Sequence, residues 1–498
     1  MSRSSWRFLC IPGVVWLGAC MTEAKPTAPL PHEATRTING ASPTRSYIVV
    51  ARSDATLPDG LSDSITALGG NIVSTIPQIG LAVVESDRVG FQEDASRLGD
   101  VEGVVPDLPI ATDGAESGEA FGSTAENVVA ALADPPMPAG GDPLSPLQWA
   151  LSAIHAPEAW ALGYKGHGAR VAVLDAGIQS THPDLVANLN KTLSKSFVAG
   201  ELYDNPPGPH GTQVSGIIAA AKNGIGVVGV APEAEIVAIK VLSARTGGGT
   251  AAAIIAGIVY AADIGADVVN MSFGGNNPRR THDVIDTRGT TDPSDDIVVR
   301  VSAAEMEQLF RAYGRAANYA HGKGVTLIAA SGNLSKDFGH SADDIGIPQE
   351  LPHVITVGPT GPLGWALDFS TSLDVSPSYT NIGTSYISLA APGGNFDVFT
   401  RPGLPPSCTV LGFVRPCQVF DLVYTTNVGS TYFWNFGGSF AAPHAAGVAA
   451  LIVSRHGAKM DPDRVEAILR NTSDDIGKPG NDALFGQGRI NALRAVQR

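Results

Sequence analysis

The stretch ARVAVLDAGI, residues 169–178, contains a continuous apolar run that ends at the carboxylate of Asp175. A short run of this kind, without alternating polar residues, is typical of a parallel strand that is buried on both faces of its sheet. A carboxylate at the end of a buried strand is energetically costly unless a partner stabilises it. The stretch therefore predicts a central strand whose carboxyl end carries a polar site.

Four similar runs follow along the chain, and predicted helices separate them. The runs are AEIVAIKVL (234–242), ADVVNMSFGG (266–275), VTLIAASGN (325–333) and VITVGPT (354–360). Helical patterns cover residues 211–222, 249–265, 303–324 and 439–457. Because strands and helices alternate, we expect residues 148–498 to form an α/β domain with a mainly parallel sheet covered by helices on both faces. Ligands bind at the carboxyl ends of the strands in such sheets.

The composition is that of an acidic globular protein. The chain has 498 residues, a formal net charge of -15 and 44% hydrophobic residues, which is enough apolar material for a large core. An acidic balance argues against a surface that binds phosphates, so we expect no nucleic-acid partner. The segment GIGVVG (224–229) matches a dinucleotide-binding pattern, but it follows a helical run and precedes Pro232, so we expect no nucleotide cofactor.

Residues 1–20 have the pattern of a secretory signal peptide. Arg3 and Arg7 precede an apolar run, Phe8 to Ala19, that is too short for a membrane-spanning helix. The run ends in LGAC, which resembles the bacterial lipobox, so we expect lipidation of Cys20; cleavage nearby without a lipid is the alternative. The protein is therefore expected to be exported, and either secreted or lipid-anchored at the bacterial cell envelope.

Three segments of different composition follow the signal peptide. Residues 21–44 are rich in Thr, Pro and Ala, which is typical of a flexible tether. Residues 45–110 predict the element order βαββαβ, the ferredoxin-like arrangement. Residues 111–147 are rich in Ala, Gly, Pro and acidic residues, and we expect an exposed linker of the kind that proteases cut.

The cysteines predict one disulfide. Cys10 and Cys20 lie in the signal segment, whereas Cys408 and Cys417 lie close together in SCTVLGFVRPC. An exported chain meets oxidising conditions, so we expect Cys408 and Cys417 to form a local disulfide.

Three polar residues occur where predicted strands end or predicted helices begin: Asp175, His210 in HGTQVSGIIAA, and Ser439 in GGSFAAPHAAG. A serine hydroxyl is a poor nucleophile at neutral pH, so a histidine must accept its proton and a buried carboxylate must orient the imidazole. The chain order Asp, His, Ser is that of subtilisin, whereas α/β-hydrolases have the order Ser, Asp, His. Ala441 also breaks the G-x-S-x-G pattern of those hydrolases, which argues against an esterase or lipase.

The segments VAVLDAGIQSTHPDL (171–185), HGTQVSGIIAA (210–220) and GGSFAAPHAAGVAAL (437–451) resemble the three signature blocks of subtilisin-like serine proteases, the subtilases of peptidase family S8. The resemblance covers residues 148–498, and residues 45–110 resemble the family's inhibitory propeptide more weakly. It implies a three-layer α/β/α fold and an exported serine endopeptidase that hydrolyses peptide bonds of proteins through an acyl-enzyme intermediate. It also implies a self-processing precursor, with its own propeptide as intramolecular inhibitor, and a monomer.

The resemblance implies a role for each matching position. Asp175, His210 and Ser439 match the catalytic triad, and Asn333 matches the side-chain donor of the oxyanion hole. One edge that pairs with substrate backbone matches Gly247, Gly248 and Gly249, and the opposite edge matches Ser272, Phe273 and Gly274. The lining of the primary side-chain pocket matches Ala330, Ser331 and Gly332. Asp184 matches one position of a structural calcium site in the family, whereas catalysis itself needs no cofactor.

The chain departs from the family pattern at Gly438, Phe440 and Gln213, where Thr, Met and His are usual, but no triad member is missing. Two segments, 276–300 and 393–436, are loop-rich additions that either shape substrate access or are tolerated surface loops. Two other functions remain as alternatives. One is a catalytically inactive relative that acts as a binding protein, and the other is an esterase.

Overall fold

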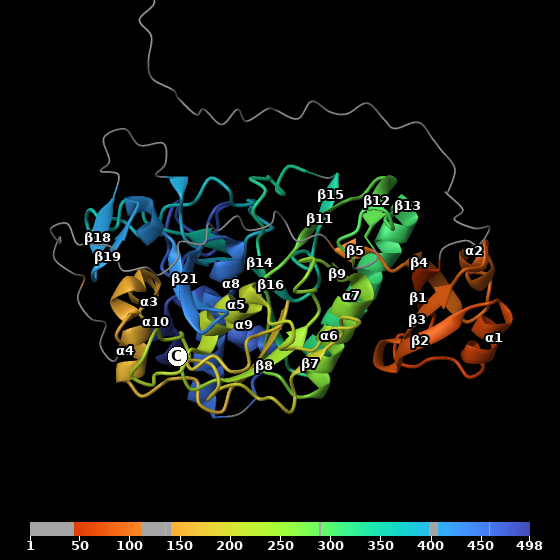
Figure 1. The fold of residues 1–498 in the computed structure, drawn as a ribbon, viewed down its shortest axis with the longest axis horizontal. Coiled ribbons are helices and arrows are strands. Elements are labelled where there is room, and N and C mark those ends of the chain that lie inside the picture. Colours follow the sequence, from red (N-terminus) through yellow and green to blue (C-terminus); the bar gives the residue numbers. More distant parts are fainter. Residues whose placement is uncertain are drawn as a thin grey trace, which may run out of the picture. The chain divides into compact units, whose positions relative to one another are not determined.

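In this computed structural model, shown in Figure 1, the described residues are 44–110, 135, 141–287, 290–341, 343–397, 407–457 and 459–498. The predicted signal segment with Cys20 lies outside them, as do almost all of the predicted tether and most of the predicted linker. Within the described residues, none of the helices combines the length and the apolar character needed to cross a membrane.

A seven-stranded sheet forms the centre of residues 141–498, and every neighbouring pair of its strands is parallel. The strand order is β17-β16-β14-β10-β6-β8-β7. All five predicted strands are present, and β7 and β17 are short additional strands at the two edges. The bounds are β6 (Arg170–Asp175), β7 (Lys195–Ser196), β8 (Glu235–Lys240), β10 (Val268–Met271), β14 (Thr326–Ala330), β16 (Val354–Thr360) and β17 (Leu389–Pro392).

The side chains of the central strands alternate between two apolar layers. On β6, Val171 and Val173 pack with one set of helices, whereas Ala172 and Leu174 pack with the other. One face is covered by α5 (Pro209–Ala219), α8 (Gly438–His456), α9 (Pro462–Thr472) and α10 (Ala492–Val496). The other face is covered by α6 (Ala251–Asp263) and α7 (Ala303–Gly322), which lie side by side in Figure 1. This arrangement confirms the predicted three-layer α/β/α fold.

Helix α8 lies against the middle of the sheet and is buried at every residue from Gly438 to Val453. Small side chains allow this close approach, since a Cβ on Gly447 would lie only 2.5 Å from the Cβ of Val230. The helix ends at Gly457, whose φ of 69° is the left-handed conformation that favours glycine at a helix C-terminus. Close packing along the helix therefore holds its first turn in one place relative to the ends of the strands.

Residues 44–110 form a four-stranded antiparallel sheet with the order β2-β3-β1-β4. This order, with the element sequence βαββαβ, is the predicted ferredoxin-like arrangement. Its two helices cover one face, where Val49, Ile65 and Phe91 are buried in a small core. The bounds are β1 (Arg45–Ala51), α1 (Leu61–Ala67), β2 (Asn71–Ile76), β3 (Leu81–Ser86), α2 (Phe91–Ala95) and β4 (Val101–Pro106).

The other face of this small sheet shares an apolar cluster with α6 and α7. Arg315 of α7 donates to the carbonyl oxygen of Ala51 at 2.9 Å and pairs with the carboxylate of Glu102 at 2.6 Å. At the start of α6, the backbone N–H of Ala252 donates to Asp107 at 2.8 Å. Burial raises the pKa of Asp107 to about 6, and the hydrogen bonds that it accepts from Ala252, Thr250 and Ser46 offset this rise only in part. The small unit is therefore attached to the two helices by apolar and polar contacts together.

Both additions to the family pattern contain β-hairpins rather than loops alone. The first contributes β11 (Gly275–Pro278), which pairs with β15 (Asp344–Ile347), and most of the hairpin β12–β13 (His282–Asp286 and Ile297–Val301). The second contains the hairpins β18–β19 (Cys408–Val410 and Phe413–Arg415) and β20–β21 (Val423–Asn427 and Thr431–Asn435). The remaining short strands and α-helices are β5 (Pro109–Ile110), β9 (Gly249–Thr250), α3 (Trp149–Ala153) and α4 (Ala156–Ala161). Short 3₁₀ helices cover Pro77–Ile79, Ser145–Leu147 and Cys417–Asp421.

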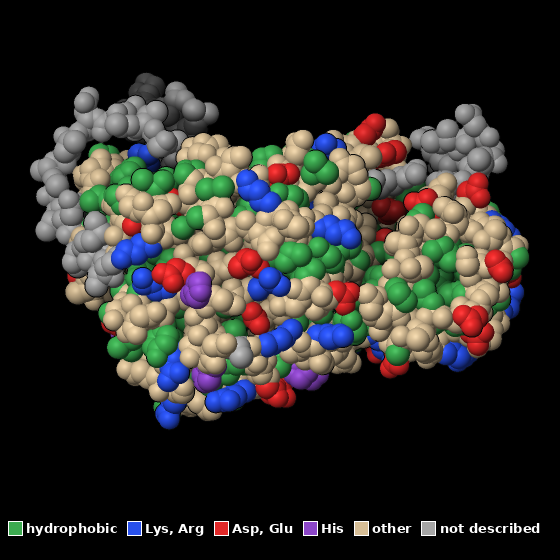
Figure 2. Space-filling model, turned by 90° about the horizontal axis from the view of Figure 1, so that it is seen from below, with side chains coloured by type: hydrophobic (Ala, Val, Ile, Leu, Met, Phe, Trp, Pro, Cys, Tyr) green, Lys and Arg blue, Asp and Glu red, His purple; other side chains and the backbone are tan. Residues whose placement is uncertain are grey.

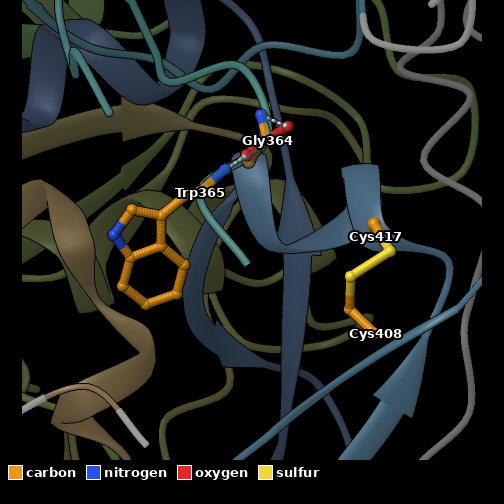
Figure 3. The surroundings of a disulfide bond; sticks show 5 residues. Gly364, Trp365, Cys408 and Cys417 are labelled. Carbon is orange, nitrogen blue, oxygen red and sulfur yellow. Dashed lines mark hydrogen bonds between the residues drawn. A yellow bond between two sulfur atoms is a disulfide. The ribbon is translucent and has the colours of Figure 1, made fainter. Parts of the chain in front are cut away.

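The expected disulfide between Cys408 and Cys417 is present, with an S–S length of 2.07 Å, and it closes the β18–β19 hairpin (Figure 3). At the end of the 3₁₀ helix that Cys417 begins, Asp421 accepts hydrogen bonds from the backbone N–H groups of Gly364 at 2.8 Å and Trp365 at 2.7 Å. The addition is thus held to the loop after β16 by buried polar contacts as well as by the disulfide.

Charged side chains are mixed on the surface that Figure 2 presents. Lys and Arg side chains are interspersed there with Asp and Glu side chains. Nucleic-acid-binding proteins typically carry a continuous basic stripe, and this face has a mixture of charges instead.

The buried histidine of α8 should make the fold acid-sensitive. His444 is 2% exposed, and its Nδ1 lies 2.7 Å from the carbonyl oxygen of Phe440. Burial lowers the pKa of His444 from 6.5 to about 4, so it stays neutral in the folded protein while the unfolded chain binds a proton. Its contribution to stability is present above pH 6.5 and is lost progressively as the pH falls towards 4.

We therefore expect the free energy of unfolding, measured with urea, to fall as the pH is lowered from 6.5 towards 4. In a His444→Gln variant the free energy of unfolding should depend less steeply on pH. A His340→Gln variant is the control, because the His340 side chain is 88% exposed. An unchanged slope in His444→Gln would contradict the assignment.

Candidate active site

Asp175 and His210 meet at the carboxyl end of β6. Asp175 is the last residue of the strand and is 1% exposed, and its Oδ1 accepts the N–H of Ala176 at 2.6 Å. His210 is the second residue of α5, and its Nδ1 lies 2.9 Å from both carboxylate oxygens of Asp175. The next residue has to be small, because a Cβ on Gly211 would lie 2.1 Å from the carbonyl oxygen of Gly177.

The first turn of α8, which carries Ser439, lies against His210. The backbone carbonyl of Ser439 accepts the hydroxyl of Ser272 at 2.8 Å, and the side chain of the next residue, Phe440, lies edge-on to the His210 ring. The two ring centroids are 5.9 Å apart at an interplanar angle of 87°. The structure therefore brings the helix that carries Ser439 against His210, although the two residues are 229 positions apart in the sequence.

Asn333 also lies at this helix end. Its Oδ1 accepts the backbone N–H of Gly438 at 2.8 Å, and a Cβ on Gly437 would lie 3.3 Å from its amide group. Gly437 has a φ of 134°, a conformation that favours glycine. Because the N–H of Gly438 fixes Oδ1, the orientation of the Asn333 amide is set, and its Nδ2 group is the hydrogen-bond donor of this side chain.

The predicted edge at Gly247, Gly248 and Gly249 pairs with another part of this chain. Gly249 lies in β9, which pairs antiparallel with β5, so that Ile110 lies opposite Gly249 and Pro109 opposite Thr250. A Cβ on Gly248 would lie 3.5 Å from the carbonyl oxygen of Ile110. The structure thus shows this edge paired with an extended strand.

The segments 272–274 and 330–332 are joined by a residue that the sequence analysis did not identify. Gln349 is buried, and its Nε2 donates to the carbonyl oxygens of Ala330 at 2.6 Å and Phe273 at 3.3 Å. A Cβ on Gly274 would lie 1.9 Å from the same nitrogen. Further along, the carbonyl oxygen of Ser331 accepts two side-chain hydrogen bonds of 2.9 Å. Gln349 lies in a turn without any motif, so only its contacts reveal it.

The β20–β21 hairpin packs along the helix that carries His210. Gln213, where the family usually has His, donates to Oδ1 of Asn427 at 3.0 Å and accepts from Nδ2 of Asn435 at 3.0 Å. The hydroxyl of Thr426 donates to the carbonyl oxygen of Thr212 at 2.7 Å. Part of the 393–436 addition therefore packs against α5, the helix that carries His210.

The other addition lies near the strand β5. The β12–β13 hairpin contacts β5 through β12, and Val299 and Val301 belong to the apolar cluster that includes Leu108 and Ile110. This hairpin borders the chain segment that occupies the candidate substrate edge.

Asp184 is the residue that matches a calcium-site position of the family. Asp184 is fully buried and accepts hydrogen bonds from Nδ2 of Asn223 at 3.2 Å and from the N–H of Val227 at 3.1 Å. Burial is the main cause that raises the pKa of its carboxyl group. Calcium binds through oxygen ligands, and the carboxylate of Asp184 offers such atoms. A structural calcium ion at Asp184 stays a prediction of the family resemblance.

The family model and the relatives that match this chain are all of the subtilisin type. The Peptidase_S8 model, described as the subtilase family, matches residues 166–488. M-protease of Shouchella clausii (strain KSM-K16) is 33% identical over 349 residues, which cover 70% of each chain. Thermitase of Thermoactinomyces vulgaris is 31% identical over 351 residues, 70% of this chain and 96% of thermitase.

Among solved structures, the epidermin leader peptide processing serine protease (EpiP) of Staphylococcus aureus has a similar fold. The TM-score is 0.67 at 21% sequence identity, and the match covers 92% of this chain and 98% of EpiP. At this identity the likeness concerns the fold alone.

The contacts of Gln213 generate a stability prediction. A Gln213→Leu substitution keeps a similar volume but removes a hydrogen-bond partner from Asn427 and Asn435, so we expect a loss of about 1–3 kcal/mol in the free energy of unfolding. Urea unfolding measures this loss, and a Gln497→Leu variant at an exposed position is the control. A double-mutant cycle with Asn427→Ala should show coupling, and additive effects would contradict the proposed link.

Proposed function

Because this chain belongs to the subtilase family of serine endopeptidases, we propose that it hydrolyses peptide bonds with Asp175, His210 and Ser439 as its catalytic triad. The observation that carries the proposal is the 2.9 Å contact of His210 Nδ1 with both Asp175 oxygens, beside the helix end that bears Ser439. With Nδ1 directed at the carboxylate, Nε2 is the nitrogen that accepts the proton of the Ser439 hydroxyl.

In the proposed reaction, Ser439 Oγ attacks the carbonyl carbon of the scissile peptide while His210 takes its proton. His210 then gives this proton to the leaving amine, and an acyl-enzyme remains on Ser439. A water molecule, deprotonated by His210, releases the acid product and restores the hydroxyl. Asp175, which is buried, stabilises the imidazolium that forms in each half of the reaction.

The negative charge on the carbonyl oxygen develops near two donors in this proposal. One is the Nδ2 group of Asn333, which is oriented by the Gly438 contact, and the other is the backbone N–H of Ser439. Both lie at the N-terminus of α8, a 19-residue helix whose dipole favours negative charge there. Residues 330–332 line the proposed primary side-chain pocket.

Substrate is proposed to bind as an extended strand between the edges at residues 247–249 and 272–274. The pairing of β5 with β9 supports this proposal, because an extended segment already forms main-chain pairs there. Such pairing recognises peptide backbone, which an ester substrate lacks. It therefore favours a protein or peptide substrate over a simple ester.

The triad assignment predicts the effect of removing one oxygen atom. A Ser439→Ala variant should lose peptide hydrolysis by several orders of magnitude while its Tm stays near that of the wild type. Asn333→Ala should show an intermediate loss of about 10²–10³ in kcat with little change in KM. Initial rates with a peptide library and labelling by a covalent serine-hydrolase probe are the measurements.

Ser454→Ala is the matched control, because Ser454 lies at the other end of α8. More than a few per cent of residual activity in purified Ser439→Ala would exclude Ser439 as the nucleophile. Loss of labelling together with full peptide cleavage would exclude it as well. A wild-type protein that is inactive on peptides and is not labelled would favour the binding-protein alternative.

We also propose that residues 45–110 are an inhibitory propeptide and that the chain cleaves itself within 111–147. Three observations support this role: the separate small core of this unit, its polar attachment to α6 and α7, and the position of Pro109 and Ile110 on the substrate edge. We propose further that the precursor is exported and anchored by a lipid on Cys20. Mass spectrometry of the mature N-terminus tests the anchor, and an unmodified N-terminus at Cys20 would exclude it.

The propeptide proposal predicts two results. Ser439→Ala protein should accumulate as the uncut precursor, whereas wild-type protein should shorten, which N-terminal sequencing detects. Added to the mature enzyme, residues 45–110 should inhibit at least about tenfold better than residues 45–106, which lack β5, because pairing with β9 is then lost. Normal processing of Ser439→Ala by itself, or equal inhibition by both segments, would contradict the proposal.

A further inference from the structure

Two histidines and an aspartate from three separate segments converge on one surface of the protease domain. His321 lies in the last turn of α7, His353 immediately precedes β16, and Asp463 lies in the first turn of α9. Nε2 of His321 is 2.9 Å from Oδ1 of Asp463. The two imidazole rings stack with a centroid distance of 3.7 Å and an interplanar angle of 15°. One nitrogen or oxygen ligand atom from each residue lies within 4.8 Å of the others.

This cluster is remote from the candidate active site. His321 and His353 lie just before the amino ends of β14 and β16, whereas Asp175 is at the carboxyl end of β6 in the same parallel sheet. The proposed catalytic residues therefore lie at the carboxyl ends of the parallel strands, whereas the cluster lies at their amino ends. No step of the proposed reaction uses these three side chains.

The chemistry of the cluster is that of a transition-metal ligand set. Neutral imidazole nitrogen and carboxylate oxygen are both ligands of zinc, and two stacked imidazoles repel each other when both are protonated. Glu466, one turn further along α9, adds a second negative charge near His353.

The backbone also holds the histidines together. His353 has a φ of 64°, in the left-handed region, which histidine adopts more readily than most residues other than glycine. This conformation persists at the turn where the His353 ring stacks on that of His321. His321 itself is constrained by the end of α7, and its side chain is 21% exposed.

From this convergence we propose that His321, His353 and Asp463 bind a divalent transition metal ion of the zinc type, with water at the remaining position. Because an ion lies in the plane of each imidazole that ligates it, one of the two rings turns out of the stack when the ion binds. The ion would connect the end of α7, the start of β16 and the start of α9, which are far apart in the sequence. Its role is to stabilise the fold, because ion binding to the native state alone shifts the unfolding equilibrium.

Two other histidine–carboxylate pairs in the described residues lack the feature on which the proposal rests, a third ligand from a separate segment. His340 and Asp337 lie 2.7 Å apart, and His155 and Glu158 lie 3.1 Å apart, but each pair has its partners three residues apart on one segment. Neither belongs to a group of three ligands among the described residues. These pairs therefore provide internal controls for simple surface ion pairs.

The test uses full-length protein that carries Ser439→Ala, so that self-digestion cannot occur, and that has no histidine tag. Isothermal titration with Zn²⁺ in metal-free buffer should show a stoichiometric site, and Zn²⁺ should raise the Tm by about 2 °C or more. Co²⁺ as a second probe should give the visible absorption of a metal with nitrogen and oxygen ligands.

In the same background, His353→Asn and Asp463→Asn should each weaken Zn²⁺ binding at least about tenfold. Asn is chosen at 353 because it tolerates a positive φ. His340→Asn is the matched control and should bind Zn²⁺ like the parent protein. Unchanged Tm values without metal show that the variants are folded. Absence of a stoichiometric site in the parent protein, or unchanged affinity in both ligand variants, would overturn the proposal.

Discussion

The burial of α8 against the sheet is the constraint on which the rest of the site depends. Its first sixteen residues are all buried, and the contact of Gly447 with Val230 leaves no room for an additional methyl group. Helix position is therefore set by packing along the whole helix rather than by contacts at its end. Ser439 lies in the first turn, so the same packing places the helix end that carries it beside His210 and Asn333.

Main-chain pairing at the edge of the site links the small unit to the large one. The strand at Pro109 and Ile110 occupies the edge at Gly249, and the sheet from which it extends rests on α6 and α7. The addition with the β12–β13 hairpin borders this strand, and the β20–β21 hairpin packs along α5. Both additions thus lie next to elements that carry the candidate site, which favours a role in substrate access over that of tolerated loops.

Much of the fold was predictable because its signals are local. Each central strand is an apolar run, as in residues 171–174, and each long helix is a continuous helical pattern, as in residues 303–324. The βαββαβ order of residues 45–110 also follows from such runs, and the observed strand order matches it. The short strands β7 and β17 were not predicted, because a two- or four-residue strand is stabilised by its neighbours in the sheet rather than by its own sequence.

By itself the sequence determined the α/β class, the residue types of the proposed triad and their order along the chain, since these depend on short motifs. Only the tertiary structure decided which distant groups meet. It brought Gln349 between residues 273 and 330, and it placed Asn223 and Val227 against the buried carboxylate of Asp184. It also joined His321, His353 and Asp463. Contacts of this kind arise from the packing of whole helices and strands, and no local pattern of residues encodes them.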